Sequence, residues 1–204
     1  MPRADTKQNG FTLIELLVVI AIIAILAGLL MPVLAGARRQ ARVVAAGCEM
    51  RSISMGMTMY SDRYEALPPA ITYCWGCSSK VDDYNRLPPE YVRWSGEDAP
   101  RDIFNEAGRS YKYIAPGPGY ANGVETILGV WVNAEFPEPG GSVRPYSDPK
   151  TSPVRFALWS VGPGGSVPFD EAMHHPVPPR FWYPNDPRGV VTWIDTPKTH
   201  VTSW

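Results

Sequence analysis

The chain has 204 residues, enough for one domain plus a membrane span, and its formal net charge of −1 at pH 7 implies no bulk attraction to nucleic acid. Its 22 prolines and 18 glycines indicate a loop-rich domain, while 7 tryptophans and 10 tyrosines supply core anchors that argue against disorder. The sequence contains no recognisable nucleophile motif, phosphate-binding loop or pair of catalytic carboxylates. We therefore expect a protein that is not an enzyme.

The stretch from residue 11 to residue 34 is the most distinctive part of the chain. From Phe11 to Leu30 only Thr12 and Glu15 interrupt a run of apolar residues. About 20 such residues, at about 1.5 Å of rise each, make about 30 Å of helix, which is the thickness of the hydrocarbon core of a bilayer. The sequence therefore predicts a membrane-spanning helix over residues 11–34.

A short polar leader, residues 1–10, precedes this span and ends in Gly10. The small residue before the apolar run indicates a processing site, although a secretory signal peptide is cut after its apolar region and not before it. Glu15 lies within the first turns of the span. Because a carboxylate is costly inside a bilayer, we expect Glu15 either to have a partner or to lie near enough to the interface to stay hydrated.

The run Gly10-Phe11-Thr12-Leu13-Ile14-Glu15, followed by an unbroken apolar stretch, resembles the class III signal of type IV pilins and type II secretion pseudopilins. In that family a prepilin peptidase cuts after the glycine and methylates the new N-terminus. The family's glutamate, the fifth mature residue, pairs with the N-terminus of a neighbouring subunit. The resemblance covers residues 1–35 and implies cleavage between Gly10 and Phe11, N-methylation of Phe11 and an assembly role for Glu15.

The charges that flank the span do not fix its orientation. The leader carries Arg3 and Lys7 against Asp5, which the positive-inside rule would place in the cytoplasm. The far flank is at least as basic and carries Arg38, Arg39 and Arg42. The family resemblance implies a single span in the bacterial inner membrane with the C-terminal domain outside the cytoplasm. Arginines beside a span are expected to face lipid phosphates and not nucleic acid.

The helix is predicted to continue beyond the span as an amphipathic helix over residues 35–66. Apolar residues recur along it at alternating steps of three and four, namely Val43, Ala46, Met50, Ile53, Met57, Tyr60 and Tyr64. The prolines of Leu67-Pro68-Pro69 should end the helix. Cys48, in a run of small residues, is expected to be buried on this helix.

Pro32 interrupts the long helix, with Gly28 one turn before it. A proline removes one backbone hydrogen bond and bends a helix, which membrane helices tolerate. One interpretation is a passive kink. The family resemblance implies another, since similar pilins have a proline at the same distance from the cut, and the segment between Glu15 and Pro32 can lose helicity as subunits pack. Pro32 is therefore a candidate assembly residue.

Residues 68–125 are expected to form a long irregular connection, because proline-containing turns punctuate them. Within this connection, Pro100 to Ala107 is a candidate short helix, since proline is favoured in a first turn. Three strand candidates follow, and each contains a tryptophan. They are Thr126–Asn133 with Trp131, Phe156–Val161 with Trp159, and Val190–Ile194 with Trp193. We expect a small antiparallel sheet that packs on the apolar stripe of the helix.

The segment from Leu158 to Gly165, LWSVGPGG, is similar to the strand–turn segment of major pseudopilins written LxSxGPDG. It departs from that pattern where the aspartate is expected, because Gly164 stands there. In the family this loop and the residues after it can bind calcium, which takes six to eight oxygen ligands. The calcium candidates here are Asp170 and Glu171, with Asp186 and Asp195 further on. The missing aspartate argues against such a site, and we expect no cofactor.

Cys74 and Cys77 form a CWGC motif with three open interpretations. An extracytoplasmic domain favours a disulfide, while free thiols and a redox or zinc motif are the alternatives. His174 and His175 follow the two acidic candidates, but adjacent histidines on an extended chain point to opposite faces and would not normally share a metal. A solvated loop is expected there.

The predicted fold class is α+β and pilin-like, with a long N-terminal helix packed on a small antiparallel sheet with long proline- and glycine-rich loops. The predicted division is a leader (1–10), a transmembrane and assembly helix (11–34), its amphipathic continuation (35–66) and an extracytoplasmic globular domain (67–204).

The resemblance implies a structural subunit of a type II secretion pseudopilus that assembles by helix packing after leader cleavage. Its partners would be other pilin-like subunits in a homo- or hetero-filament, a prepilin peptidase, the inner membrane and a secretion or pilus assembly platform, with no nucleic acid. Two alternatives stay open. One is a type IV pilus subunit, and the other is a singly anchored extracytoplasmic module that binds glycan or protein through its aromatic loops.

Overall fold

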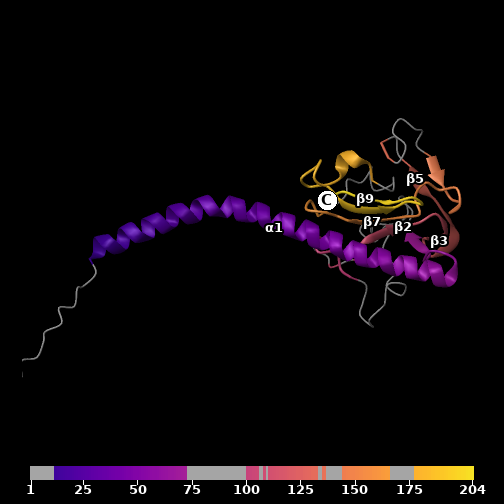
Figure 1. The fold of residues 1–204 in the computed structure, drawn as a ribbon, viewed down its shortest axis with the longest axis horizontal. Coiled ribbons are helices and arrows are strands. Elements are labelled where there is room, and N and C mark those ends of the chain that lie inside the picture. The colour runs from indigo at the N-terminus through magenta and orange to yellow at the C-terminus, as the bar shows by residue number, and fades with distance from the viewer. Residues whose placement is uncertain are drawn as a thin grey trace, which may run out of the picture. The chain divides into compact units, whose positions relative to one another are not determined.

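The computed structural model describes residues 12–72, 100–105, 108, 110–132, 135–136, 144–165 and 177–204 (Figure 1). The chain divides into two units, residues 1–40 and 41–204, and each is described by itself. Several predicted site residues lie outside the described ranges, namely Gly10, Phe11, Cys74, Cys77, Asp170, Glu171, His174 and His175.

One long helix, α1 (Leu13–Tyr64), runs through both units. In its first unit the apolar side chains are exposed, with 45% to 82% of each large one accessible. Among the described residues, α1 is the one helix long and apolar enough to cross a membrane. Pro32 lies inside it without ending it. The helix ends just before Glu65, whose φ of 54° is left-handed, and Pro68 follows, so the predicted end is confirmed.

In the second unit α1 contributes one apolar stripe to the core, as its periodicity predicts. We call Val43, Ala46, Met50, Ile53 and Met57 the core stripe, and each is at most 1% exposed. Tyr60 is half-buried and Tyr64 is 56% exposed, so the stripe ends one turn earlier than predicted.

Another contact fixes the C-terminus of the chain to this helix. The indole ring of Trp204 lies so close to Gly47 that a Cβ there would be 2.4 Å from the ring. A glycine inside a helix costs stability, and here it makes room for that ring.

The main sheet is antiparallel in the order β2-β7-β8-β9. Its strands are β2 (Lys112–Ile114), β7 (Phe156–Ser160), β8 (Val191–Asp195) and β9 (His200–Thr202). All five residues of β7 are buried, and its apolar residues share one hydrophobic cluster with the core stripe of α1. The two strands predicted over residues 156–161 and 190–194 are therefore confirmed.

Two smaller sheets complete the described part of the second unit. The first has the order β1-β3-β4, from β1 (Ala70–Thr72), β3 (Gly117–Ala121) and β4 (Val124–Leu128), and its β1–β3 pair is parallel. The second pairs β5 (Val130–Val132) with β6 (Arg144–Tyr146). A short 3-10 helix, η3, covers Pro179–Phe181. The α+β class is thus confirmed, with small sheets on a long helix.

Several of these strands were not predicted from the sequence. The connection expected to be irregular over residues 68–125 contains β1, β2 and β3. The strand predicted over residues 126–133 is instead split at Gly129 between β4 and β5. The Gly-Pro-Gly start of β3 has the composition of a turn, yet a Cβ on Gly119 would lie 2.6 Å from the carbonyl oxygen of Ala70. That glycine serves close strand approach and not a turn.

The helix predicted from Pro100 to Ala107 is wrong over the described residues 100–105, which form a turn. Asp102 explains the difference. Its carboxylate accepts a hydrogen bond from the backbone N–H of Phe104 at 3.0 Å, and its carbonyl oxygen accepts one from Asn105 at 3.0 Å. Such local side-chain bonds compete with helix formation.

Candidate assembly and processing site

The N-terminus of α1 is closed by a reciprocal pair of hydrogen bonds between Thr12 and Glu15. The Glu15 carboxylate accepts from the backbone N–H of Thr12 at 2.9 Å and from its hydroxyl at 2.7 Å. The Thr12 hydroxyl in turn accepts from the backbone N–H of Glu15 at 3.3 Å. This is a capping box, which satisfies helix N–H groups that have no partner within the helix.

The capping box gives Glu15 a local partner that the sequence reasoning overlooked. The signal was present, because Thr12-Leu13-Ile14-Glu15 fits the threonine-x-x-glutamate pattern just before an apolar run. Glu15 therefore has two candidate roles: it can cap its own helix, and its carboxylate can face the amine of another chain. A glutamine would keep the first role and lose the negative charge.

From Leu16 to Ala37 the helix surface offers only apolar and small residues for packing. No non-local atom lies within 4 Å of the Cβ position of either Gly28 or Gly36, so both leave open space on the helix. Small residues on membrane helices allow close approach of another helix. Pro32 lies between these two glycines, and its assembly role remains a prediction.

Two expectations for the second half of α1 are corrected. Arg42 does not point away toward lipid, since its guanidinium donates to the carbonyl oxygen of Ile103 and stacks 4.6 Å from the ring centroid of Phe104. Cys48 is exposed and not buried. The core stripe steps from Ala46 directly to Met50, four residues on, which leaves position 48 on the other side of the helix.

The turn that resembles the calcium loop is held by backbone contacts. Gly165 N–H donates to the Gly162 carbonyl at 2.9 Å, and Gly164 N–H donates to the Arg188 carbonyl at 3.0 Å. A Cβ on Gly164 would lie 2.4 Å from that same Arg188 oxygen. The aspartate of the family pattern therefore does not fit at position 164.

The other described carboxylates near this turn already have partners. Asp186 accepts from the backbone N–H of Arg188 at 2.8 Å. Asp195 forms an ion pair with Arg155, with 3.2 Å between Oδ2 and Nη1. Burial raises the pKa of Asp195, while Arg155 and His200 oppose that shift. No group of three or more metal-binding side chains occurs among the described residues.

A buried carboxylate, Asp102, ties the loop before β2 to the end of β7. It is 3% exposed and accepts three hydrogen bonds, one of them from Phe104. The others come from the Ser160 hydroxyl at 2.7 Å and the Val161 N–H at 2.8 Å. Burial raises the pKa of Asp102, and these bonds and the nearby Lys112 oppose the shift. No local sequence pattern singles out this residue.

Replacing Asp102 with alanine should lower the free energy of unfolding of the second unit by about 3 kcal/mol or more, because three buried donors lose their acceptor. Ser160→Ala is the matched comparison, since it leaves the Phe104 and Val161 N–H groups paired with Asp102 and takes one acceptor only from the Gly162 N–H, which bonds to the Ser160 hydroxyl at 3.0 Å. It should cost less than Asp102→Ala, about 1–2 kcal/mol. Urea unfolding of the full chain in detergent, followed by tryptophan fluorescence, measures both. Equal unfolding free energies for Asp102→Ala and wild type would show that Asp102 does not hold this loop.

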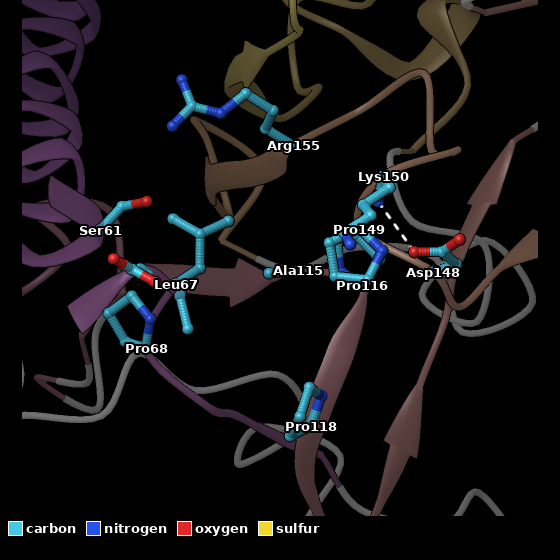
Figure 2. Close-up of a pocket in the computed structure, with 12 residues that line it drawn as sticks. Ser61, Leu67, Pro68, Ala115, Pro116, Pro118, Asp148, Pro149, Lys150 and Arg155 are labelled. Atoms are coloured by element: carbon cyan, nitrogen blue, oxygen red, sulfur yellow. Dashed lines mark hydrogen bonds between the residues drawn. The ribbon is translucent and has the colours of Figure 1, made fainter.

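A groove of about 290 Å³ lies where the end of α1 meets the loops around β3 and β7 (Figure 2). Figure 2 shows proline rings on several sides of it, namely Pro68, Pro116, Pro118 and Pro149. The Asp148 carboxylate at its rim accepts from the Lys150 N–H at 2.9 Å. His200 stacks on Trp193 with ring centroids 4.4 Å apart. Neither feature brings together groups that suggest catalysis.

Comparison with known proteins agrees with the N-terminal geometry. Residues 5–31 match the model of the prokaryotic N-terminal methylation motif. A relative from Escherichia coli K12 is 41% identical over 119 residues, which cover 56% of this chain and 77% of the relative. Relatives from Pseudomonas aeruginosa and Vibrio cholerae are each 30% identical, over 112 and 113 residues. These cover 54% of this chain in both cases, and 76% and 73% of the relatives.

All three relatives are named type II secretion system core protein G. The chain belongs to the type II secretion pseudopilin family. No solved structure matches it. Membership confirms the resemblance seen in residues 10–15 and supports membrane anchoring of this pseudopilin through α1.

Proposed function

We propose that this pseudopilin is a structural subunit of a type II secretion pseudopilus. It waits in the inner membrane on the first unit of α1, and a prepilin peptidase removes residues 1–10 and methylates Phe11. Subunits then leave the bilayer and pack helix against helix into a filament. Other pilin-like subunits and the assembly platform are its partners, and the globular domain lies outside the cytoplasm.

The observation that carries this proposal is the exposed apolar segment of α1, which has a carboxylate in its first turn. From Leu13 to Leu34 no side chain is buried in the single chain, so lipid or neighbouring helices must cover them. Glu15 stands at the start of that surface. A protein that is only anchored in the membrane gains little from a carboxylate at this depth. In a filament, the Glu15 carboxylate can pair with the amine of mature Phe11 in a neighbouring subunit.

The proposal is tested by coexpressing the full chain with a prepilin peptidase and a type II secretion assembly platform. Sheared cell-surface material is then examined by electron microscopy with an antibody against the globular domain. We expect labelled filaments that require both the peptidase and the platform. Labelled protein that stays in the membrane as single chains under these conditions would favour the anchored binding module.

The orientation of the domain is tested by its cysteine chemistry. If the domain lies outside the cytoplasm, Cys74 and Cys77 should resist alkylation until a reductant is added, because that compartment favours a disulfide. Exposed Cys48 is the internal control, since in chains separated by detergent it should label without reductant. Mass spectrometry of natively isolated protein counts the labelled thiols. Labelling of all three without reductant would indicate a reducing compartment and the opposite topology.

We also propose that the turn at Gly162–Gly165 holds its shape without calcium. A bound calcium ion would stabilise the folded state and raise the melting temperature. Without such an ion, adding a chelator should change the melting temperature by less than about 1 °C. Gly164→Asp should destabilise the domain by about 2 kcal/mol or more, with no rescue by calcium. Gly165→Asn is the control, since no atom lies within 4 Å there and asparagine tolerates its φ of 73°. A rise of about 5 °C on adding calcium would contradict the proposal.

A further inference from the structure

Two apolar faces of the second unit are left uncovered in the single chain, and both are built from regular elements. The first lies on α1, on the side opposite the core stripe. We call it the outer helix stripe, and it consists of Val44, Cys48, Arg51, Met55 and Met59. These residues follow one another at steps of four, three, four and four, so they share one face of the helix.

The outer helix stripe is strongly exposed. Val44 is 45%, Met55 is 54% and Met59 is 69% accessible, and Cys48 and Arg51 are exposed as well. Solvated helix faces are normally polar, because only the face toward the core gains from apolar side chains. A row of valine and methionine residues around a single arginine is therefore a surface that a partner would cover.

The second face lies on the hairpin of β3 and β4. Its strand register pairs Pro118 with Ile127 and Tyr120 with Glu125, which places these four residues on one face. We call them the exposed sheet face, and all four are exposed, with Tyr120 at 38% and Ile127 at 61%. The other face of the hairpin turns Gly119 and Leu128 into the protein.

The two faces are complementary in the type of secondary structure and in charge. One is a helix row with Arg51 at its centre, and the other is a sheet surface that carries Glu125 beside its apolar residues. Neither the Arg51 guanidinium nor the Glu125 carboxylate has a hydrogen bond or ion pair to another described residue. A helix covering the open face of a sheet is one of the standard layer arrangements.

The spacing along the two elements also agrees. Arg51 lies about 4.5 Å along the helix axis from Cys48 and about 6 Å from Met55. Glu125 and Ile127 are about 6.6 Å apart along their strand. When Arg51 faces Glu125, Ile127 can therefore lie beside Cys48 or beside Met55, depending on the direction in which the strand runs along the helix.

We propose that the outer helix stripe of one copy docks on the exposed sheet face of the next copy. Because the two faces differ, the contact is head-to-tail, and a head-to-tail contact whose rotation does not close can repeat along a filament. This contact rests on the proposed function. Each patch is small, so it acts between copies that their N-terminal helices already hold together. The Arg51–Glu125 pair sets the register of neighbouring domains.

The test uses the full chain in membranes with the peptidase and assembly platform. Cys74→Ser and Cys77→Ser leave native Cys48 as the reporter, and Ile127→Cys supplies its partner. A short bismaleimide should link position 127 of one copy to Cys48 of another copy. If the strand crosses the helix in the opposite direction, position 127 should instead link to Met55→Cys, tested in a Cys48→Ser background. Thr126→Cys is the matched control, since it neighbours Ile127 on the opposite face of β4 and should give little product.

Charge reversal then tests the pairing itself. Arg51→Glu alone and Glu125→Arg alone should each lower the crosslink yield about fivefold, and the double variant should restore it. Lys198→Glu, at an exposed lysine in the turn before β9 that belongs to neither face, should leave the yield unchanged. Equal crosslinking from positions 126 and 127, or no rescue by the double variant, would overturn the proposal.

A second pair of cysteines in the first unit keeps this inference separate from the proposed function. If crosslinks between N-terminal segments persist while none forms from position 127, the filament stands and the docking of the two faces is wrong. If the N-terminal crosslinks are absent too, the proposed filament and the docking contact both fail.

Discussion

Replacing Glu15 with either alanine or glutamine should abolish assembly while membrane insertion stays at least as efficient as in the wild type. Both changes remove a charge that is costly in a bilayer, so neither should hinder insertion. What both remove is the carboxylate that the amine of mature Phe11 in a neighbouring subunit would face. Carbonate extraction measures insertion, and sedimentation of sheared material measures assembly.

The two variants separate the two roles of Glu15. Alanine removes both the capping box with Thr12 and the charge, whereas glutamine keeps a side chain that can complete the box. If capping alone mattered, Glu15→Gln would assemble like the wild type and Glu15→Ala would not. Assembly of Glu15→Gln at the wild-type level would therefore contradict the charge-pairing account.

Replacing Gly10 with valine should leave the leader attached to nearly every chain. The family's peptidase cuts after a glycine, and a β-branched side chain would crowd the bond that it cleaves. The uncut chain keeps its basic leader and has no amine at Phe11, so it should insert in the membrane and fail to assemble. Intact-mass spectrometry after coexpression with the peptidase reports both the missing ten-residue cut and the missing methyl group.

A matched change outside the signal keeps this result interpretable. Gly36→Val lies on α1 with open space around it, and it should be processed like the wild type. Processing of Gly10→Val to the wild-type extent would mean that the cut does not follow Gly10, and the resemblance would then not extend to cleavage.

The sequence predicted the helical part of the fold well, because α1 is governed by local rules. Its apolar run, the period of its core stripe and the prolines after Tyr64 each act within a few residues. The strands β7 and β8 were predicted for the same reason, since both are short runs of β-branched, aromatic and aliphatic residues next to turn signals.

The parts that the sequence missed depend on contacts between distant residues. β3 begins with glycine and proline and becomes a strand only because β1 and β4 pair with it. Asp102 turns the chain where a helix was expected, since its acceptors are filled by Ser160 and Val161, about 60 residues away. Such long-range partners leave no periodic pattern that a single sequence could reveal.

The candidate site shows the same division. The processing signal is a contiguous run, and it was recognised from Gly10 to Glu15. The exposure of Cys48 and the contact of Arg42 with the loop at Ile103 depend on tertiary packing, and both expectations were wrong. The capping box was not predicted, although its pattern is also contiguous in the sequence, from Thr12 to Glu15.

The central claim is that Glu15 of one subunit pairs with the N-terminus of the next, and register-specific crosslinking tests it most directly. Pairing of Phe11 in one subunit with Glu15 in the next shifts the two helices along their axes by about four residues, or about 6 Å. In a background with Cys48, Cys74 and Cys77 changed to serine, single cysteines replace Leu16 in one coexpressed copy and Ile20 in the other. The account predicts that the 16–20 crosslink exceeds the 16–16 crosslink in the wild type, and that this preference is lost in Glu15→Ala and Glu15→Gln. An equal preference for the 16–20 crosslink in all three, at matched membrane levels, would contradict it.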